Sequence, residues 1–156
     1  MQRFIAIVVL VVAGPIAGSS PDLFELAVLS PSEAAALAKQ CSRPGPPPFD
    51  GTWTPTRAQV SALKVHLPGL VGMKATGCCL QERSIKTLSN VRVQVVGLVL
   101  VGGKRVFYLN GLSGMEGEES WRTKADVVCD GGDAFWGVIF DPATDAFSDL
   151  AFNGSV

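Results

Sequence analysis

The chain has 156 residues, with 13 basic against 14 acidic side chains and a formal net charge of −1. The charges are scattered and nearly balanced, which excludes the basic stripe that nucleic acid would require. A chain of this length, less an N-terminal leader, predicts one domain that buries roughly two-thirds of the surface exposed by its unfolded form.

Residues 1–19 have the three-part layout of a secretory signal peptide. Arg3 supplies a positive charge, residues 4–13 are an uninterrupted apolar run, and Ala17 and Ser19 are small residues suited to cleavage. We expect cleavage after Ser19, with Ala17 as the second choice, and a periplasmic or secreted protein without a membrane span after signal removal. The alternative is an uncleaved anchor, although the run is short for a hydrocarbon core that takes about 20 residues.

Residues 20–52 are expected to form an N-terminal helix and a connector within the same domain. Residues 23–29 are a strand or the lead-in to a helix. Ser30 and Glu33 have the spacing of a capping box and predict the start of a helix. The four prolines in residues 43–48 prevent that helix from continuing and predict a stiff, extended connector.

Residues 53–156 are expected to contain a covering helix and a sheet. A helix is predicted from Thr54–Thr56 to Pro68, and Val60, Leu63 and Leu67 fall on one face of it. A short helix over 80–88 is a further expectation.

Period-two alternation and turn residues predict the strands that follow. Gly102–Gly103 is a typical two-residue hairpin turn between two apolar runs. We therefore predict an α+β fold with two N-terminal helices and an antiparallel meander of four to five strands, with a helix packed on one face. The expected strands are 91–101, 105–109, 124–129, 135–140 and 146–152.

The C-terminal pattern WGV-x-x-DPAT-x-x-F-x-x-L-x-FNG, from Trp136 to Gly154, resembles that of small exported bacterial proteins of uncharacterised function. The segments that begin at Cys41 (CSRP) and at Trp53 (WTPT) are similar to earlier parts of the same proteins. The resemblance implies export and this fold. It implies no activity that could be transferred to the chain.

The four cysteines are candidates for disulfides, because an exported protein meets an oxidising compartment. Cys41 and Cys129 each stand beside a turn, and the resembling segments contain both, so we expect them to form the structural bridge. The alternatives join each of them to a member of the pair Cys78–Cys79, or join that pair to itself. No C-x-x-C pair occurs and His66 is the only histidine, which argues against zinc.

Candidate catalytic groups are few. His66 is expected to end the covering helix, where it interacts well with the helix dipole. The aspartates flank turns, where their side chains typically bond the backbone of the turn. We therefore expect no catalytic residue, no metal and no cofactor. The aspartates concerned are Asp130, Asp133, Asp141, Asp145 and Asp149.

Both faces of the predicted strands are apolar, and only one can meet the covering helix. The remainder predicts an exposed aromatic patch for a partner, with Trp121, Phe135 and Trp136 as its candidate residues. The leading hypothesis is an exported non-enzymatic envelope protein that binds a macromolecular partner, as an inhibitor or accessory factor. The alternatives are a small hydrolase that uses the Asp-rich turns and a membrane-tethered structural protein with an uncleaved leader.

Overall fold

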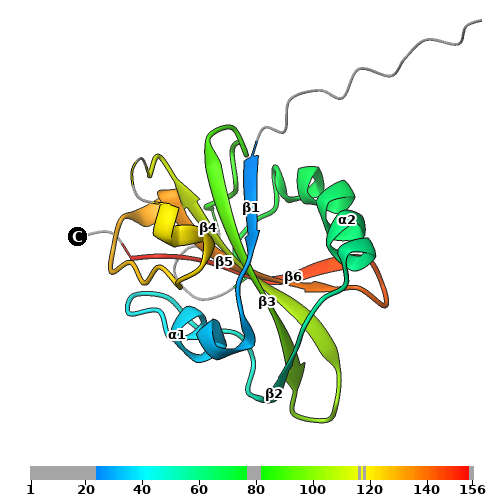
Figure 1. Cartoon of the computed structure of the whole chain (residues 1–156). Helices are drawn as coiled ribbons and strands as arrows, with labels where there is room; N and C mark the ends of the chain where they lie inside the picture. Colours follow the sequence, from blue (N-terminus) through cyan, green and yellow to red (C-terminus); the bar gives the residue numbers. More distant parts are fainter. Residues whose placement is uncertain (1–23, 77–81, 116, 118, 155–156) are drawn as a thin grey trace, which may run out of the picture.

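The computed structural model describes residues 24–76, 82–115, 117 and 119–154. They form an α+β fold around one mixed, six-stranded sheet (Figure 1). The predicted leader and the pair Cys78–Cys79 lie outside the described residues. The elements are β1 (Phe24–Val28), α1 (Ala34–Ala38), β2 (Phe49–Trp53), α2 (Arg57–His66), β3 (Val91–Leu100), β4 (Arg105–Ser113), β5 (Phe135–Asp141) and β6 (Ala146–Phe152).

The long strand β3 organises the sheet. On one side it pairs antiparallel with β4, and the order continues through β5 to β6. On its other side two short strands share its length. β1 runs parallel to its first half, with Val28 opposite Val95, and β2 runs antiparallel to its second half, with Trp53 opposite Gly97.

Both faces of β3 are buried, which explains its almost continuous apolar sequence. Val93 and Val95 belong to the core on one face, whereas Val96 and Leu98 belong to the core on the other. Strand alternation places these two pairs on opposite sides of the sheet.

Helix α2 covers the first face. Thr56 caps it, since its side chain accepts a bond from the Gln59 backbone while Gln59 bonds the Thr56 backbone in return. Leu63 and Leu67 have no exposed surface and pack into the core built by β3 to β6. The predicted covering helix is confirmed. Of its expected apolar stripe, Leu63 and Leu67 are in the core, whereas Val60 is only half-buried.

The second face is covered by α1 and by irregular chain. Leu37 of α1 is fully buried in a core with Val96, Tyr108 and Ile139. The expected capping box at its start is wrong, because the Ser30 side chain bonds the Ser32 hydroxyl and caps no backbone N–H group of this turn. The Glu33 carboxylate instead accepts a bond from the Ala125 backbone N–H at 2.9 Å.

Three further expectations require correction. The sheet is mixed and has six strands, because residues 24–28 and 49–53 both join β3. Residues 124–129 are not a strand, since side chains rather than a neighbouring strand bond much of their backbone. Residues 82–88 are not a helix. They run alongside residues 72–75, to which they are joined by backbone bonds such as Gly72 N–H to Ile85 C=O.

The packing of α2 on the sheet can be measured at Leu63. Leu63→Ala should lower the free energy of unfolding by about 2–5 kcal/mol, because the removed methyl groups leave a cavity beneath the helix. Urea unfolding measures this loss, with Ala62→Gly at an exposed position of the same helix as a control for backbone propensity, expected to cost about 1 kcal/mol. A loss below about 1 kcal/mol for Leu63→Ala would contradict this packing.

Candidate functional site

A buried polar cluster lies on the second face, beside the apolar core under α1. We call it the amide cluster, and it consists of Gln40, Arg43, Gln94, Asn110 and Asn153, all buried. The Arg43 guanidinium donates to the Oδ1 atoms of Asn153 (2.6 Å) and Asn110 (2.5 Å), with the Tyr108 hydroxyl at 3.4 Å. Its Nε is also buried and has no partner. Among the described residues, no carboxylate forms an ion pair with Arg43.

The amides of this cluster bond the backbone of residues 121–130. Gln94 Nε2 donates to two carbonyl groups there, and Asn153 Nδ2 donates to two more. Asn110 Nδ2 and Gln40 Nε2 both donate to the same carbonyl, that of Asp126. These bonds satisfy backbone carbonyl groups that a strand would pair with its neighbour. The acceptors are the carbonyl groups of Trp121, Lys124, Asp126, Val128 and Asp130.

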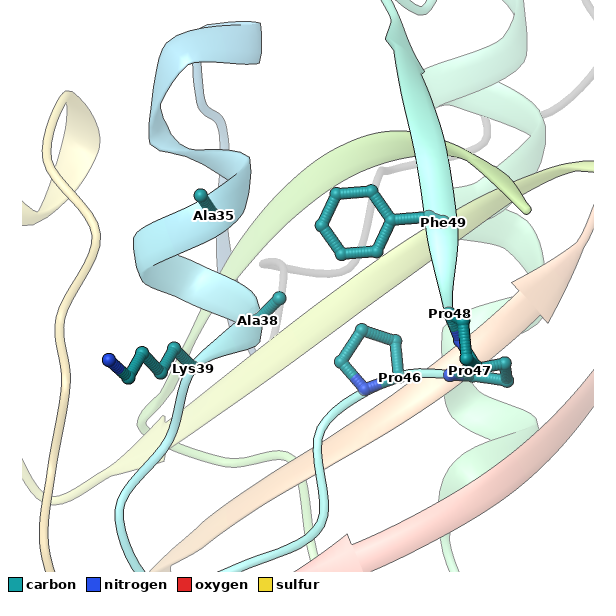
Figure 2. A pocket seen from close by; sticks show the side chains of 7 residues that line it. All are labelled: Ala35, Ala38, Lys39, Pro46, Pro47, Pro48 and Phe49. Carbon is teal, nitrogen blue, oxygen red and sulfur yellow. The ribbon is translucent and has the colours of Figure 1, made fainter. Parts of the chain in front are cut away.

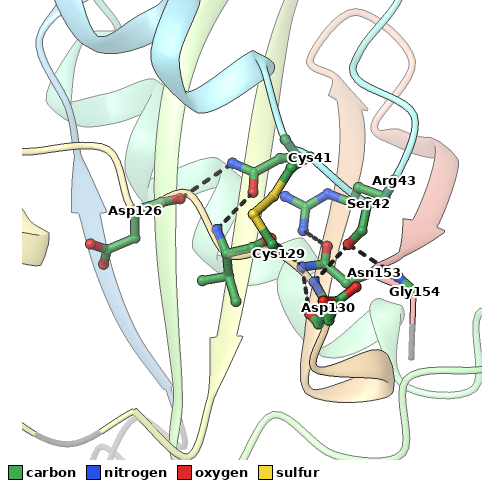
Figure 3. Close-up of a disulfide and its surroundings, with 10 residues drawn as sticks. Cys41, Ser42, Arg43, Asp126, Cys129, Asp130, Asn153 and Gly154 are labelled. Atoms are coloured by element: carbon green, nitrogen blue, oxygen red, sulfur yellow. Dashed lines mark hydrogen bonds between the residues drawn. A yellow bond between two sulfur atoms is a disulfide. The ribbon is translucent and has the colours of Figure 1, made fainter. Parts of the chain in front are cut away.

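A disulfide joins this segment to the start of the connector. Cys41 and Cys129 are bonded, with their Cα atoms 5.2 Å apart, and the predicted bridge is confirmed (Figure 3). Between Cys41 and Arg43, the Ser42 hydroxyl accepts bonds from the backbone N–H groups of Asp130 (2.9 Å) and Gly154 (3.2 Å). The disulfide and the Ser42 bonds therefore hold the start of the connector against Cys129 and Asp130, and the bond to Gly154 adds the end of the chain that follows β6.

The three aromatic residues predicted to form a partner patch are placed differently. Trp136 is 1 % exposed and lies across Gly111 of the neighbouring strand, where an added Cβ would come within 2.0 Å of the indole. Trp121 is 2 % exposed, and the Arg122 guanidinium lies over its ring at 4.5 Å. Only Phe135 is partly exposed. The expected exposed patch is thus corrected at both tryptophans, whose side chains fill space inside the domain.

Asp141 is engaged at the start of the β5–β6 turn. Its carboxylate accepts bonds from the Ala143 backbone N–H (2.9 Å) and the Thr144 hydroxyl (3.1 Å), and it pairs with Lys104 at 2.8 Å. The Lys104 ammonium, followed by the Ala143 N–H, holds the pKa of Asp141 below its ordinary value. This is the turn bonding that the sequence predicts for an aspartate before proline.

His66 ends α2, and its imidazole lies on the Phe140 ring, with 5.4 Å between the centroids. Its Nε2 is 3.4 Å from Asp145 Oδ1, so the helix end contacts the β5–β6 turn. The structure brings His66 and Asp145 together, which the sequence did not indicate. Both groups are partly open to solvent, and the contact joins two surface elements.

An open hollow lies between α1 and the proline connector (Figure 2). It has a volume of about 430 Å³, and we call it the α1 hollow. Two alanine methyl groups from α1 form one wall, and prolines with the half-buried Phe49 ring form the other. Lys39 stands at its rim, with its side chain directed outward. The lining residues are Ala35, Ala38, Lys39, Pro46, Pro47, Pro48 and Phe49.

Sequence reasoning missed the α1 hollow. Ala35 and Ala38 stand at i and i+3, the spacing of one helix face, but small residues on a short helix carry no functional signal by themselves. The proline run predicted a stiff spacer and gave no indication of what it would lie against. The hollow depends on the course of the connector past α1, which is anchored by Arg43 and the disulfide at its start.

In the part of the chain that the structure describes, no three His, Cys, Asp or Glu side chains come together as metal ligands. No helix among these residues is long and apolar enough to cross a membrane.

Comparisons of the chain with family models, with curated proteins and with solved structures find no match.

The role of Asp141 predicts a pH-dependent effect of its removal. Asp141→Ala should lower the free energy of unfolding at pH 7 by about 0.5–2 kcal/mol, through loss of the turn bonds and the Lys104 pair. Because the folded pKa is lowered, the carboxylate stabilises the fold fully above the unfolded pKa of about 3.9, and this contribution disappears as the pH falls through the folded value. Urea unfolding of both proteins should therefore show a difference that shrinks below about pH 4.

His66→Ala, at the other contact of the same turn, is the control and should cost less than Asp141→Ala at pH 7. A difference for Asp141→Ala that stays constant down to about pH 2 would contradict an ionised, turn-bonded Asp141.

Proposed function

We propose that the chain is an exported, non-enzymatic protein that binds a macromolecular partner in the cell envelope, as an inhibitor or accessory factor, through the α1 hollow. The observation that carries this proposal is the hollow itself. It is open, walled by methyl groups, prolines and an aromatic ring, and bordered by an exposed cation. Concave apolar surfaces with a few polar groups at the rim are typical binding sites.

The proposed binding surface is the α1 hollow and not a face of the sheet, because both faces of the sheet are covered. The sequence favoured an exposed face of the sheet as the docking surface, but α2 covers one face, and α1 with residues 121–130 covers the other. Only a few large apolar side chains are exposed among the described residues, namely Val65, Val71, Val101, Met115 and Val127. In the described part of the structure, the α1 hollow is the larger of two places where apolar groups gather around an accessible space, the other being a hollow of about 250 Å³ beside Ile85, Ala134 and Trp136.

Two observations support export and a non-catalytic role. The leader pattern of residues 1–19 and the Cys41–Cys129 bridge both suit an oxidising compartment outside the cytoplasm. The Asp141 carboxylate is occupied by its own turn and by Lys104, which disfavours the alternative hydrolase with catalytic Asp-rich turns.

A matched pair of substitutions on α1 tests the proposal. Ala35 and Ala36 are both exposed, but only Ala35 lines the hollow. Ala35→Trp should fill the hollow and reduce capture of the partner from envelope extract at least about tenfold, a loss of about 1.4 kcal/mol in binding. Ala36→Trp adds the same indole beside the hollow and should leave capture unchanged.

The measurement is quantitative mass spectrometry of captured proteins, with the tagged wild-type chain and both variants as baits. Melting temperatures of the variants should agree within about 2 °C, so that a loss of capture reflects the blocked surface. Equal capture by both variants, or no protein retained by the wild type above the background of an untagged control, would contradict the proposal.

A further inference from the structure

Strand β2 has an unpaired edge. Within residues 24–76, 82–115, 117 and 119–154, β2 pairs with β3 alone. No backbone bond from its other side reaches another described segment. Successive residues of a strand direct their N–H and C=O groups to alternate edges. A bulge between Phe49 and Gly51 interrupts this alternation, and the regular part of β2 that follows it presents free donors and acceptors. Such an edge is a template for an added strand.

The α1 hollow lies beside the start of this edge. Phe49 is the first residue of β2 and also a wall of the hollow (Figure 2). The preceding Pro46, Pro47 and Pro48 have no N–H group to donate, so an added strand can form a complete ladder of donors and acceptors with β2 but not with the connector. An apolar side chain of that strand would reach the hollow, and this combination of edge and side-chain pocket is how β-strand addition gains specificity.

Unpaired charges of both signs lie next to this surface. Lys39 at the rim of the hollow and Asp50 on β2 are both exposed. In the described part of the chain neither takes part in an ion pair, since those present involve other side chains. An occupant with one acidic and one basic residue around a central apolar side chain would match this arrangement.

We propose that the partner presents an extended peptide segment that adds to the free edge of β2 and places an aromatic side chain in the α1 hollow. This inference rests on the proposed function and specifies the form of the ligand. The chemistry that recognises the segment is backbone pairing along β2, burial of one aromatic ring against Ala35, Ala38 and Phe49, and charge complementarity to Lys39 and Asp50.

The probe is the peptide acetyl-Thr-Lys-Thr-Phe-Thr-Glu-Thr amide with a fluorescent label, together with the version in which lysine and glutamate are exchanged. Fluorescence anisotropy should show saturable binding of at least one of the two peptides to the whole mature chain. Parallel and antiparallel addition to β2 would place the lysine and the glutamate at opposite ends, so each direction of addition favours a different peptide. Ala35→Trp should weaken that binding at least about tenfold, whereas Ala36→Trp should leave it unchanged.

Two N-methylated peptides separate edge pairing from simple apolar contact. One is methylated at its threonines and the other at the intervening residues, so each loses the N–H donors of one edge only. Because one edge of the peptide faces β2, one of the two should bind at least about tenfold more weakly, while the other stays within about threefold of its parent. Failure of both peptide orders to bind, or equal binding by both methylated forms, would overturn strand addition.

The proposed function can survive that failure. Capture of a partner that Ala35→Trp abolishes, without peptide binding, would keep the α1 hollow as a docking site and remove the extended peptide as its occupant. Sedimentation of the chain alone provides a further outcome. A dimer that dissociates when the peptide is added would assign the β2 edge to a second copy of the chain and overturn the proposal.

Discussion

The second face of this domain depends on a buried positive charge with neutral partners. Arg43 is 6 % exposed and donates to the side-chain oxygens of Asn110 and Asn153. Moving a guanidinium out of water is costly, and the two amide oxygens offset that cost at Nη1 and Nη2, while the buried Nε has no hydrogen-bond partner. Because each amide oxygen faces Arg43, each amide nitrogen faces away and donates to the backbone of residues 121–130. One charge thus orients two amides, and the amides hold a segment that has no strand partner of its own.

This arrangement also positions the α1 hollow. The connector is held at its start by Cys41 and Arg43 and at its end by the bond from the Val101 N–H to the Pro48 carbonyl, at 3.1 Å. The prolines along this segment have a fixed φ, which restricts the conformations that the connector can adopt. The wall they form is therefore preorganised, and a ligand that binds there does not bear the entropy cost of ordering it. The shape of the surface proposed for binding therefore follows from the hydrogen bonds and the disulfide that hold the second face together.

The sequence predicts those parts of the fold that local patterns specify. Helix α2 and the hairpins follow from apolar periodicity and turn residues. The direction of β1 does not, because five mostly apolar residues carry no signal of their partner strand. Residues 124–129 have strand-like composition, yet their backbone is bonded by polar side chains far away in the sequence. Gln94 and Asn110, polar residues inside apolar strands, were the available signal for that cluster. The α1 hollow depends on contacts between distant segments and could not be predicted.

A double-mutant cycle on Arg43 and Asn153 tests the central claim most directly. Urea unfolding of the wild type, Arg43→Met, Asn153→Ala and the double variant gives the coupling energy between the two side chains, with the disulfide intact in all four proteins. A charge-assisted hydrogen bond in a buried site predicts a coupling of about 1.5–3 kcal/mol, so that the double variant loses less stability than the sum of the single ones. Losses that add within about 0.5 kcal/mol would show that Arg43 and Asn153 act independently, and would contradict the account of the amide cluster as the constraint that holds the second face together.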